Sequence, residues 1–172
     1  MRDDWVIVAD GAQARFMVFT WHAGPSRGAL RLVETSQLDN PECTVSGRRD
    51  SRKIKSGYDD TSYRFTDHRE QHDDELHRRF VDRIASQAQA LVTSGEISAI
   101  TLMANVRMMN LLLPAFESVS KAGVSISTLS RDYTWCTAPQ IQQHLQDNDL
   151  IPMHFKARLA QLRAAPHQTS LF

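Results

Sequence analysis

Hydrophobic and polar positions follow two different periods along this chain, and the periods predict where its strands and helices lie. Two apolar runs, Trp5–Ala9 and Arg15–Thr20, flank Asp10 and Gly11. Because Asp-Gly accommodates the positive φ of a tight turn, this pattern predicts a β-hairpin, which we expect at the edge of the core sheet. A leucine on each side of Arg31 predicts a third strand with its leucines pointing inward.

After residue 66, apolar residues recur with the spacing of an α-helix. Asp67 and Glu70 have the spacing of a capping box, and the apolar positions that follow predict one long helix ending at Gly95. Beyond it, the pattern predicts a strand at 97–103, a helix at 106–113 that Pro114 interrupts, and its continuation to Gly123. The last predicted elements are a strand at 124–129, a helix from Thr137 to residue 145 and a helix at 153–163.

Strands separated by helices favour parallel pairing, so we predict an α/β protein with a mixed β-sheet flanked by helices. The length of 172 residues and a hydrophobic content of 41% are enough for one domain, which we assign to residues 1–150. Residues 151–172 then form a C-terminal helix and a flexible tail. Residues 39–66 show no apolar period, and we expect them to form a mobile loop.

Charge and cysteine content narrow the class of protein. Lys+Arg and Asp+Glu are both 20, so nucleic-acid binding requires a local basic surface rather than bulk charge. Cys43 and Cys136 form no C-x-x-C pair, which is typical of a reduced, cytoplasmic protein. The opening residues resemble neither a signal peptide nor a membrane span, and we expect no membrane partner.

Known catalytic and phosphate-binding motifs are absent from the sequence. Gly11 is followed by no second glycine until Gly24, whereas a phosphate loop needs several close glycines. No G-x-S-x-G nucleophile motif occurs, and neither cysteine has a spacing that identifies a base. The sequence therefore indicates no cofactor, and an enzyme is the less favoured class.

The order of several short motifs resembles the bacterial host attachment protein family. The chain carries WVIVADGAQARFMVF, then DHREQHDDELHRRF, then a late R-D-Y-T at residues 131–134 in place of that family's K-D-L-T-type signature. The resemblance covers roughly residues 5 to 150. The family's name refers to a requirement for attachment of bacteria to a host.

This family is also similar to the middle domain of archaeal and eukaryotic translation release factors, which implies an RNase H-like fold. In release factors a Gly-Gly-Gln loop promotes release of the peptide. Here the corresponding loop reads Lys55-Ser56-Gly57-Tyr58, and Gly-Gly-Gln occurs nowhere in the chain. The resemblance therefore implies a link to the ribosome but not the release reaction.

Residues 45–64 form the main candidate for nucleic-acid binding. Six cations stand against three carboxylates, and two tyrosines can stack on unpaired bases. A solvated loop without a ligand remains the alternative. The candidate residues are Arg48, Arg49, Arg52, Lys53, Lys55, Tyr58, Tyr63 and Arg64.

Two other kinds of site are weaker alternatives. His68 and His72 lie four apart on the long helix and can share a zinc or nickel ion, although no third ligand is evident. Asp10 and Asp132 both follow predicted strands, where an RNase H-like nuclease binds divalent metal. A turn at Asp10 and a cap at Asp132 explain both residues more simply.

The last five residues resemble the short peptides by which bacterial proteins bind the DNA sliding clamp. Gln168, Leu171 and Phe172 match that pattern, while Thr169 replaces the usual leucine. Packing of Leu171 and Phe172 on the protein itself is the alternative. The tail is thus a candidate contact for a protein partner.

From the sequence we predict a non-catalytic binding module that associates with RNA or the ribosome. The first alternative is a protein–protein interaction factor in host-cell attachment. The second is a metal-dependent nuclease or hydrolase using Asp10 and Asp132. The sequence does not determine the oligomeric state.

Overall fold

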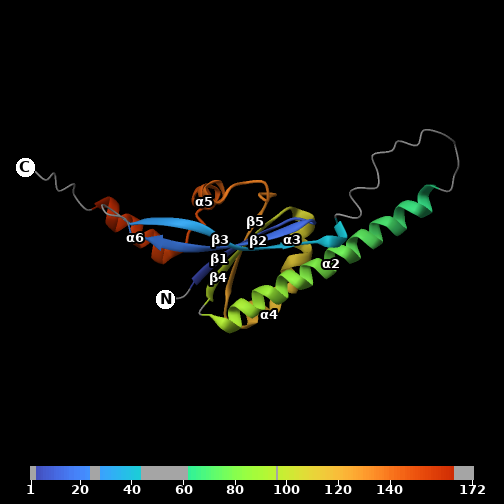
Figure 1. Ribbon diagram of the computed structural model, residues 1–172, viewed down its shortest axis with the longest axis horizontal. Coiled ribbons are helices and arrows are strands. Elements are labelled where there is room, and N and C mark those ends of the chain that lie inside the picture. Colours follow the sequence, from blue (N-terminus) through green and yellow to red (C-terminus); the bar gives the residue numbers. More distant parts are fainter. Residues whose placement is uncertain (1–2, 24–27, 44–61, 96, 165–172) are drawn as a thin grey trace, which may run out of the picture.

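A computed structural model shows a mixed five-stranded sheet with helices on both faces (Figure 1). It describes residues 3–23, 28–43, 62–95 and 97–164, except for the side chains of residues 62–71 and 162–164. The predicted α/β class with a mixed sheet flanked by helices is confirmed. The strands are β1 (Asp3–Ala9), β2 (Gln13–His22), β3 (Ala29–Asp39), β4 (Ile97–Ala104) and β5 (Ser125–Ser130).

The strand order is β3-β2-β1-β4-β5. β2 is antiparallel to both β1 and β3, whereas β4 is parallel to both β1 and β5. The predicted hairpin exists, but its position was wrong, since β1 is the central strand rather than an edge strand. Both faces of a central strand are buried, which explains why the run WVIVA is almost continuously apolar.

Two layers of helices cover the sheet (Figure 1). On one face, Ile7 and Phe16 pack against α2 (Ser62–Ser94), α3 (Val106–Ala115) and α4 (Glu117–Lys121). On the other face, Val8 and Phe19 pack against α5 (Ala138–Asp147) and α6 (Met153–Ala164). The alternation of side chains along β1 and β2 therefore supplies two separate cores.

The long helix α2 begins earlier than predicted. The capping-box prediction at Asp67 was wrong, because α2 starts at Ser62 and Asp67 lies inside it. The first part of α2 projects beyond the sheet (Figure 1), and a projecting segment lacks the apolar period that a buried face imposes. Its predicted end holds: α2 stops at Ser94, and Gly95 N donates to Leu91 O at 3.1 Å.

The remaining boundaries agree with the sequence to within a few residues. Pro114 lies in the last turn of α3, and the break follows at Phe116. β5 covers Ser125–Ser130, one residue later than predicted. At the start of α5, the Gln140 side chain accepts a hydrogen bond from Thr137 N at 2.9 Å, in agreement with Thr137 as the predicted N-cap.

Gly123 ends the α4 segment in the left-handed region, with φ at 90°. We predict that Gly123→Ala lowers the free energy of unfolding by about 1 kcal/mol, because an L side chain is strained at this φ. Gly95→Ala is the matched control, since Gly95 has no positive φ and its Cβ would make only an ordinary contact at 3.5 Å. Urea unfolding measures both; equal effects of the two variants would contradict the prediction.

Candidate functional site at the carboxyl end of the sheet

The carboxyl ends of β1, β4 and β5 bring the sequence motifs together. Asp10 follows β1, Asn105 follows β4, and residues 131–136, which we call the 131–136 segment, follow β5. In an open α/β sheet this is the end at which ligands usually bind, because loops from several strands meet there.

The β1–β2 turn is built by Asp10. Its Oδ1 accepts hydrogen bonds from Ala12 N at 2.7 Å and Gln13 N at 2.8 Å, which is an Asx-type turn. At the end of β3, Asn40 holds the same turn: its Nδ2 donates to Gly11 O at 2.8 Å and its backbone N donates to Ala12 O at 2.7 Å. Asp10 therefore has the structural role in the turn that the sequence suggested.

Gly11 has a different role from the one predicted. Among the glycines that the structure describes, only Gly123 has a positive φ, so the expected positive φ at Gly11 was wrong. Instead, a Cβ at Gly11 would lie 2.4 Å from His77 Nε2. The glycine permits the imidazole of α2 to approach the turn closely.

Thr134 connects the turn to the 131–136 segment. Its hydroxyl lies 2.8 Å from Asp10 Oδ2 and 2.7 Å from Asp132 Oδ1, and its backbone N donates to Asp132 Oδ1 at 3.0 Å. A single hydroxyl proton is shared between two carboxylates, and it donates to one of them at a time. Asp10 and Asp132 are thus brought together, as expected from their positions after strands.

Arg15 fixes the same segment from the side of β2. Its Nη1 donates to the carbonyls of Thr134 at 3.1 Å and Cys136 at 2.6 Å. Its Nε and Nη2 donate to Glu34 Oε2 at 3.1 and 2.6 Å, and the Arg15 side chain is only 11% exposed. One guanidinium therefore links β2, β3 and the 131–136 segment with four hydrogen bonds.

Trp135 is held at the surface by this arrangement. Its neighbours Thr134 and Cys136 are 7% and 2% exposed, whereas Trp135 itself is 75% exposed. Tyr133 is also buried, and its ring lies 4.6 Å from that of His144 on α5. The sequence alone did not point to Trp135; its position inside the D-Y-T-W run was the only available signal.

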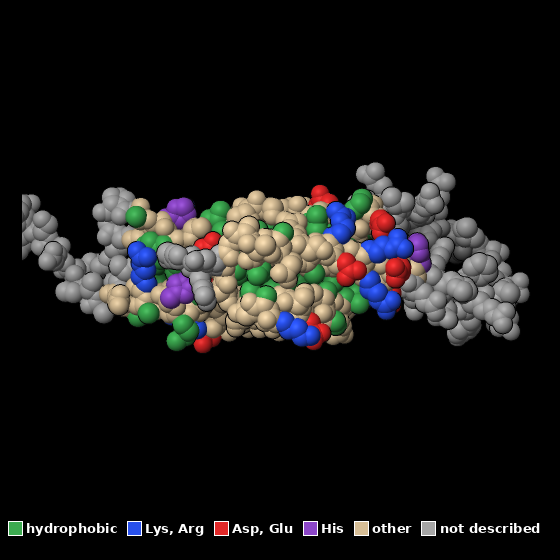
Figure 2. Space-filling view, turned by 90° about the horizontal axis from the view of Figure 1, so that it is seen from below, with side chains coloured by type: hydrophobic (Ala, Val, Ile, Leu, Met, Phe, Trp, Pro, Cys, Tyr) green, Lys and Arg blue, Asp and Glu red, His purple; other side chains and the backbone are tan. Residues whose placement is uncertain are grey.

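The end of the sheet carries mixed charges rather than a basic patch. Figure 2 shows Lys/Arg and Asp/Glu side chains interleaved at the end of the molecule where α2 begins. Arg107 Nη2 donates to Asp74 Oδ1 at 2.5 Å, and this bond lowers the pKa of Asp74. Arg79 Nε lies 3.3 Å from Glu75 Oε1, so both of these arginines are paired with neighbouring carboxylates.

A small cavity of about 180 Å³ lies beside the turn, lined by Gly11, His77, Asn105 and three residues of α3. His77 Nδ1 is buried and makes no hydrogen bond within the described part of the chain. Nearby, Cys43 has a raised pKa, chiefly because of burial and then because of the charges of Asp10 and Asp73. Its thiol therefore lacks the lowered pKa of a nucleophilic cysteine.

Several predicted site residues lie outside what the structure describes. They are Arg48, Arg49, Arg52, Lys53, Lys55, Tyr58 and the tail residues Gln168, Leu171 and Phe172. For Tyr63, Arg64 and His68, only the backbone is described, as part of α2. His72 is exposed on α2, and no group of three or more metal-ligating side chains occurs within the described ranges.

The last described residue before the basic segment is Cys43. Cys43 N donates to Asn40 O at 3.3 Å, and Asn40 in turn holds the β1–β2 turn. Cys43 therefore lies close to the turn to which Thr134 is bonded.

The fold is an α/β domain in which residues from the two ends of the sequence pattern, Asp10 and Thr134, meet at one turn. Residues 5–145 match the family described as "Protein required for attachment to host cells", and the chain belongs to this family. A search of curated proteins gave no match. No helix in the described part of the chain is long and apolar enough to cross a membrane.

The hydroxyl of Thr134 can be removed without changing the shape of the side chain. We predict that Thr134→Val lowers the free energy of unfolding by about 1–3 kcal/mol, because Asp10 Oδ2 loses its hydrogen-bond donor. Thr134→Ser keeps the hydroxyl and is the matched control. Urea unfolding followed by circular dichroism measures both; a Val variant as stable as the Ser variant would contradict the role given to this hydroxyl.

The contact between Gly11 and His77 gives a second prediction. We expect Gly11→Ala to cost about 1 kcal/mol, near the lower limit for overpacking, because the imidazole borders the small cavity and has room to move. In a His77→Ala background the same substitution should cost almost nothing. A double-mutant cycle of unfolding free energies measures the difference, and additive costs would exclude the contact as the reason for the glycine.

Proposed function

We propose that this member of the host attachment family is a binding module for single-stranded RNA, with the ribosome as the RNA-containing partner. The observation that supports the proposal is the exposed Trp135, whose neighbour Thr134 is bonded to the β1–β2 turn, close to Cys43, the last described residue before the basic segment 45–64. An indole in this position offers a flat surface on which an unpaired base can stack.

The basic segment supplies what the described surface lacks. Arg79 and Arg107 at the end of the sheet are paired with Glu75 and Asp74, so we expect most phosphate contacts to come from the six Lys and Arg residues of positions 45–64. Stacking on Trp135 and phosphate neutralisation by this segment are independent contributions. The strand order, with β2 alone running opposite to its neighbours, also supports the RNase H-like relationship that links the family to release factors.

A catalytic role for Asp10 and Asp132 is less favoured by the geometry. Asp10 Oδ1 accepts two backbone hydrogen bonds and its Oδ2 faces the Thr134 hydroxyl, while Asp132 Oδ1 is bonded to Thr134. These oxygens already accept hydrogen bonds within the protein, which leaves them less able to bind a metal ion. We therefore retain the protein–protein role in attachment as the alternative, because an exposed tryptophan is also typical of protein interfaces.

RNA binding is tested with a fluorescein-labelled 15-nucleotide poly-U strand and with purified bacterial ribosomes. We expect binding that weakens steeply with salt and that falls about tenfold in Trp135→Ala, since stacking on one aromatic ring contributes roughly 1–3 kcal/mol. Changing Arg48, Arg49, Arg52 and Lys53 to Ala should reduce the salt dependence as well as the affinity. Fluorescence anisotropy and co-sedimentation at two salt concentrations measure these effects.

Met153→Ala is the matched control for Trp135→Ala, because Met153 on α6 is equally exposed at 75%. A variant in which the order of residues 45–64 is scrambled keeps the charge of this segment. Because phosphate contacts depend mainly on charge, this variant should retain most of the affinity for poly-U. No binding to either RNA at low salt would refute the proposal. A salt-tolerant protein partner lost in Trp135→Ala would support the attachment alternative instead.

A further inference from the structure

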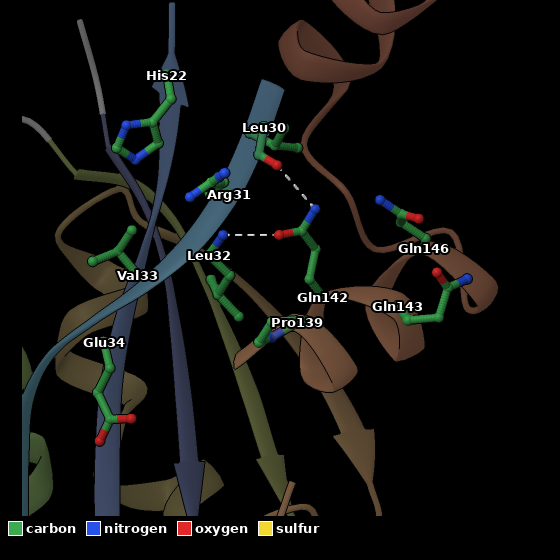
Figure 3. A pocket seen from close by; sticks show the side chains of 10 residues that line it. All are labelled: His22, Leu30, Arg31, Leu32, Val33, Glu34, Pro139, Gln142, Gln143 and Gln146. Atoms are coloured by element: carbon green, nitrogen blue, oxygen red, sulfur yellow. Dashed lines mark hydrogen bonds between the residues drawn. The ribbon is translucent and has the colours of Figure 1, made fainter. Parts of the chain in front are cut away.

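A larger groove lies on a different part of the molecule, between the edge strand β3 and helix α5 (Figure 3). Its volume is about 810 Å³, and its walls are residues 30–34 of β3 and the glutamine-rich side of α5. We propose that this groove binds an extended, acidic peptide segment of a partner protein, which adds to β3 as a further strand. This proposal does not depend on RNA binding.

The edge of β3 faces the groove with its backbone. β3 pairs with β2 on one side only, because it is the last strand of the sheet. Leu32 N and Leu30 O point away from β2, since Gln142 reaches both of them from α5. By the alternation of an antiparallel ladder, Leu32 O points the same way, and no described residue outside the sheet donates a hydrogen bond to it.

Gln142 shows which chemical group this edge accepts. Its Oε1 accepts from Leu32 N at 2.8 Å, and its Nε2 donates to Leu30 O at 3.1 Å (Figure 3). A carboxamide has the donor and acceptor of a peptide group, so Gln142 occupies the position of an amide in a neighbouring strand. An incoming peptide would replace Gln142 and also reach Leu32 O, as in known cases of strand addition.

The side chains around the groove favour an acidic peptide. Arg31 and His22 lie at the groove, and Arg31 makes no ion pair with any residue in the described ranges. The carboxylate that lines the groove, Glu34, is bonded to Arg15 and is therefore offset. A carboxylate on the incoming strand would gain Arg31 as a partner, whereas a basic strand would face an uncompensated cation.

The probe is a random dodecapeptide library displayed on phage. The library is selected separately on the wild-type protein and on Gln142→Ala. We expect enriched peptides to combine β-branched residues with Asp or Glu. A selected peptide should bind Gln142→Ala about tenfold more tightly than wild type, because the competing hydrogen bonds are absent. Gln146→Ala, on the same wall of the groove, is the matched control and should leave the affinity unchanged. Arg31→Glu should weaken binding of the acidic peptide.

Two further measurements make the result decisive. The ¹⁵N-amide resonance of Leu32 should shift on peptide binding, and thermal unfolding by circular dichroism shows that each variant is folded at the temperature used. The proposal would be overturned if neither the wild-type protein nor Gln142→Ala enriched any peptide. An unchanged affinity of a selected peptide for Gln142→Ala would also overturn it. Stronger dimerisation of Gln142→Ala would overturn it as well, because it would assign the groove to a second copy of the chain.

Discussion

The guanidinium of Arg15 joins its own strand, β2, to two other parts of the chain, β3 and the 131–136 segment. It bonds Glu34 on β3 and the carbonyls of Thr134 and Cys136, which lie more than a hundred residues away in sequence. These carbonyls follow the last strand and have no ladder partner, so burying them without a donor would be costly. The position of the 131–136 segment, and with it the exposure of Trp135, depends on this one side chain.

Asp10 gives the same segment a further contact, through the side chain of Thr134. Asp10 Oδ1 accepts the hydrogen bonds that shape the β1–β2 turn, and Asp10 Oδ2 faces the Thr134 hydroxyl. The motif A-D-G-x-x-A-R and the later R-D-Y-T signature are therefore two halves of one structural unit. Trp135, which takes part in none of these side-chain bonds, stays 75% exposed beside this unit.

The two candidate binding regions use different physical principles. At the carboxyl end of the sheet, the exposed ring of Trp135 offers a stacking surface, while Arg107 is paired with Asp74. At the β3 edge, backbone groups that would otherwise invite pairing with another chain are partly covered by the Gln142 carboxamide. A side-chain cover of this kind protects the edge and still permits exchange, because it is held by only two hydrogen bonds.

The sequence by itself determined the elements whose burial imposes a period. The alternation around Arg31, the helix ending at Gly95 and the interrupted helix near Pro114 follow from local propensity and from which face is apolar. The start of α2 at Ser62 did not follow, because the first part of this helix extends beyond the sheet and no core selects its residues.

Only the tertiary structure decided the roles of the site residues. The sequence placed Asp10 and Asp132 after strands, yet it could not show that one threonine hydroxyl lies between them. It assigned Gly11 to a positive φ, whereas the reason for the glycine is a histidine that lies sixty-six positions later and approaches only in the folded chain. Local patterns report on a residue's own backbone and burial, while contacts between distant segments depend on how the layers pack.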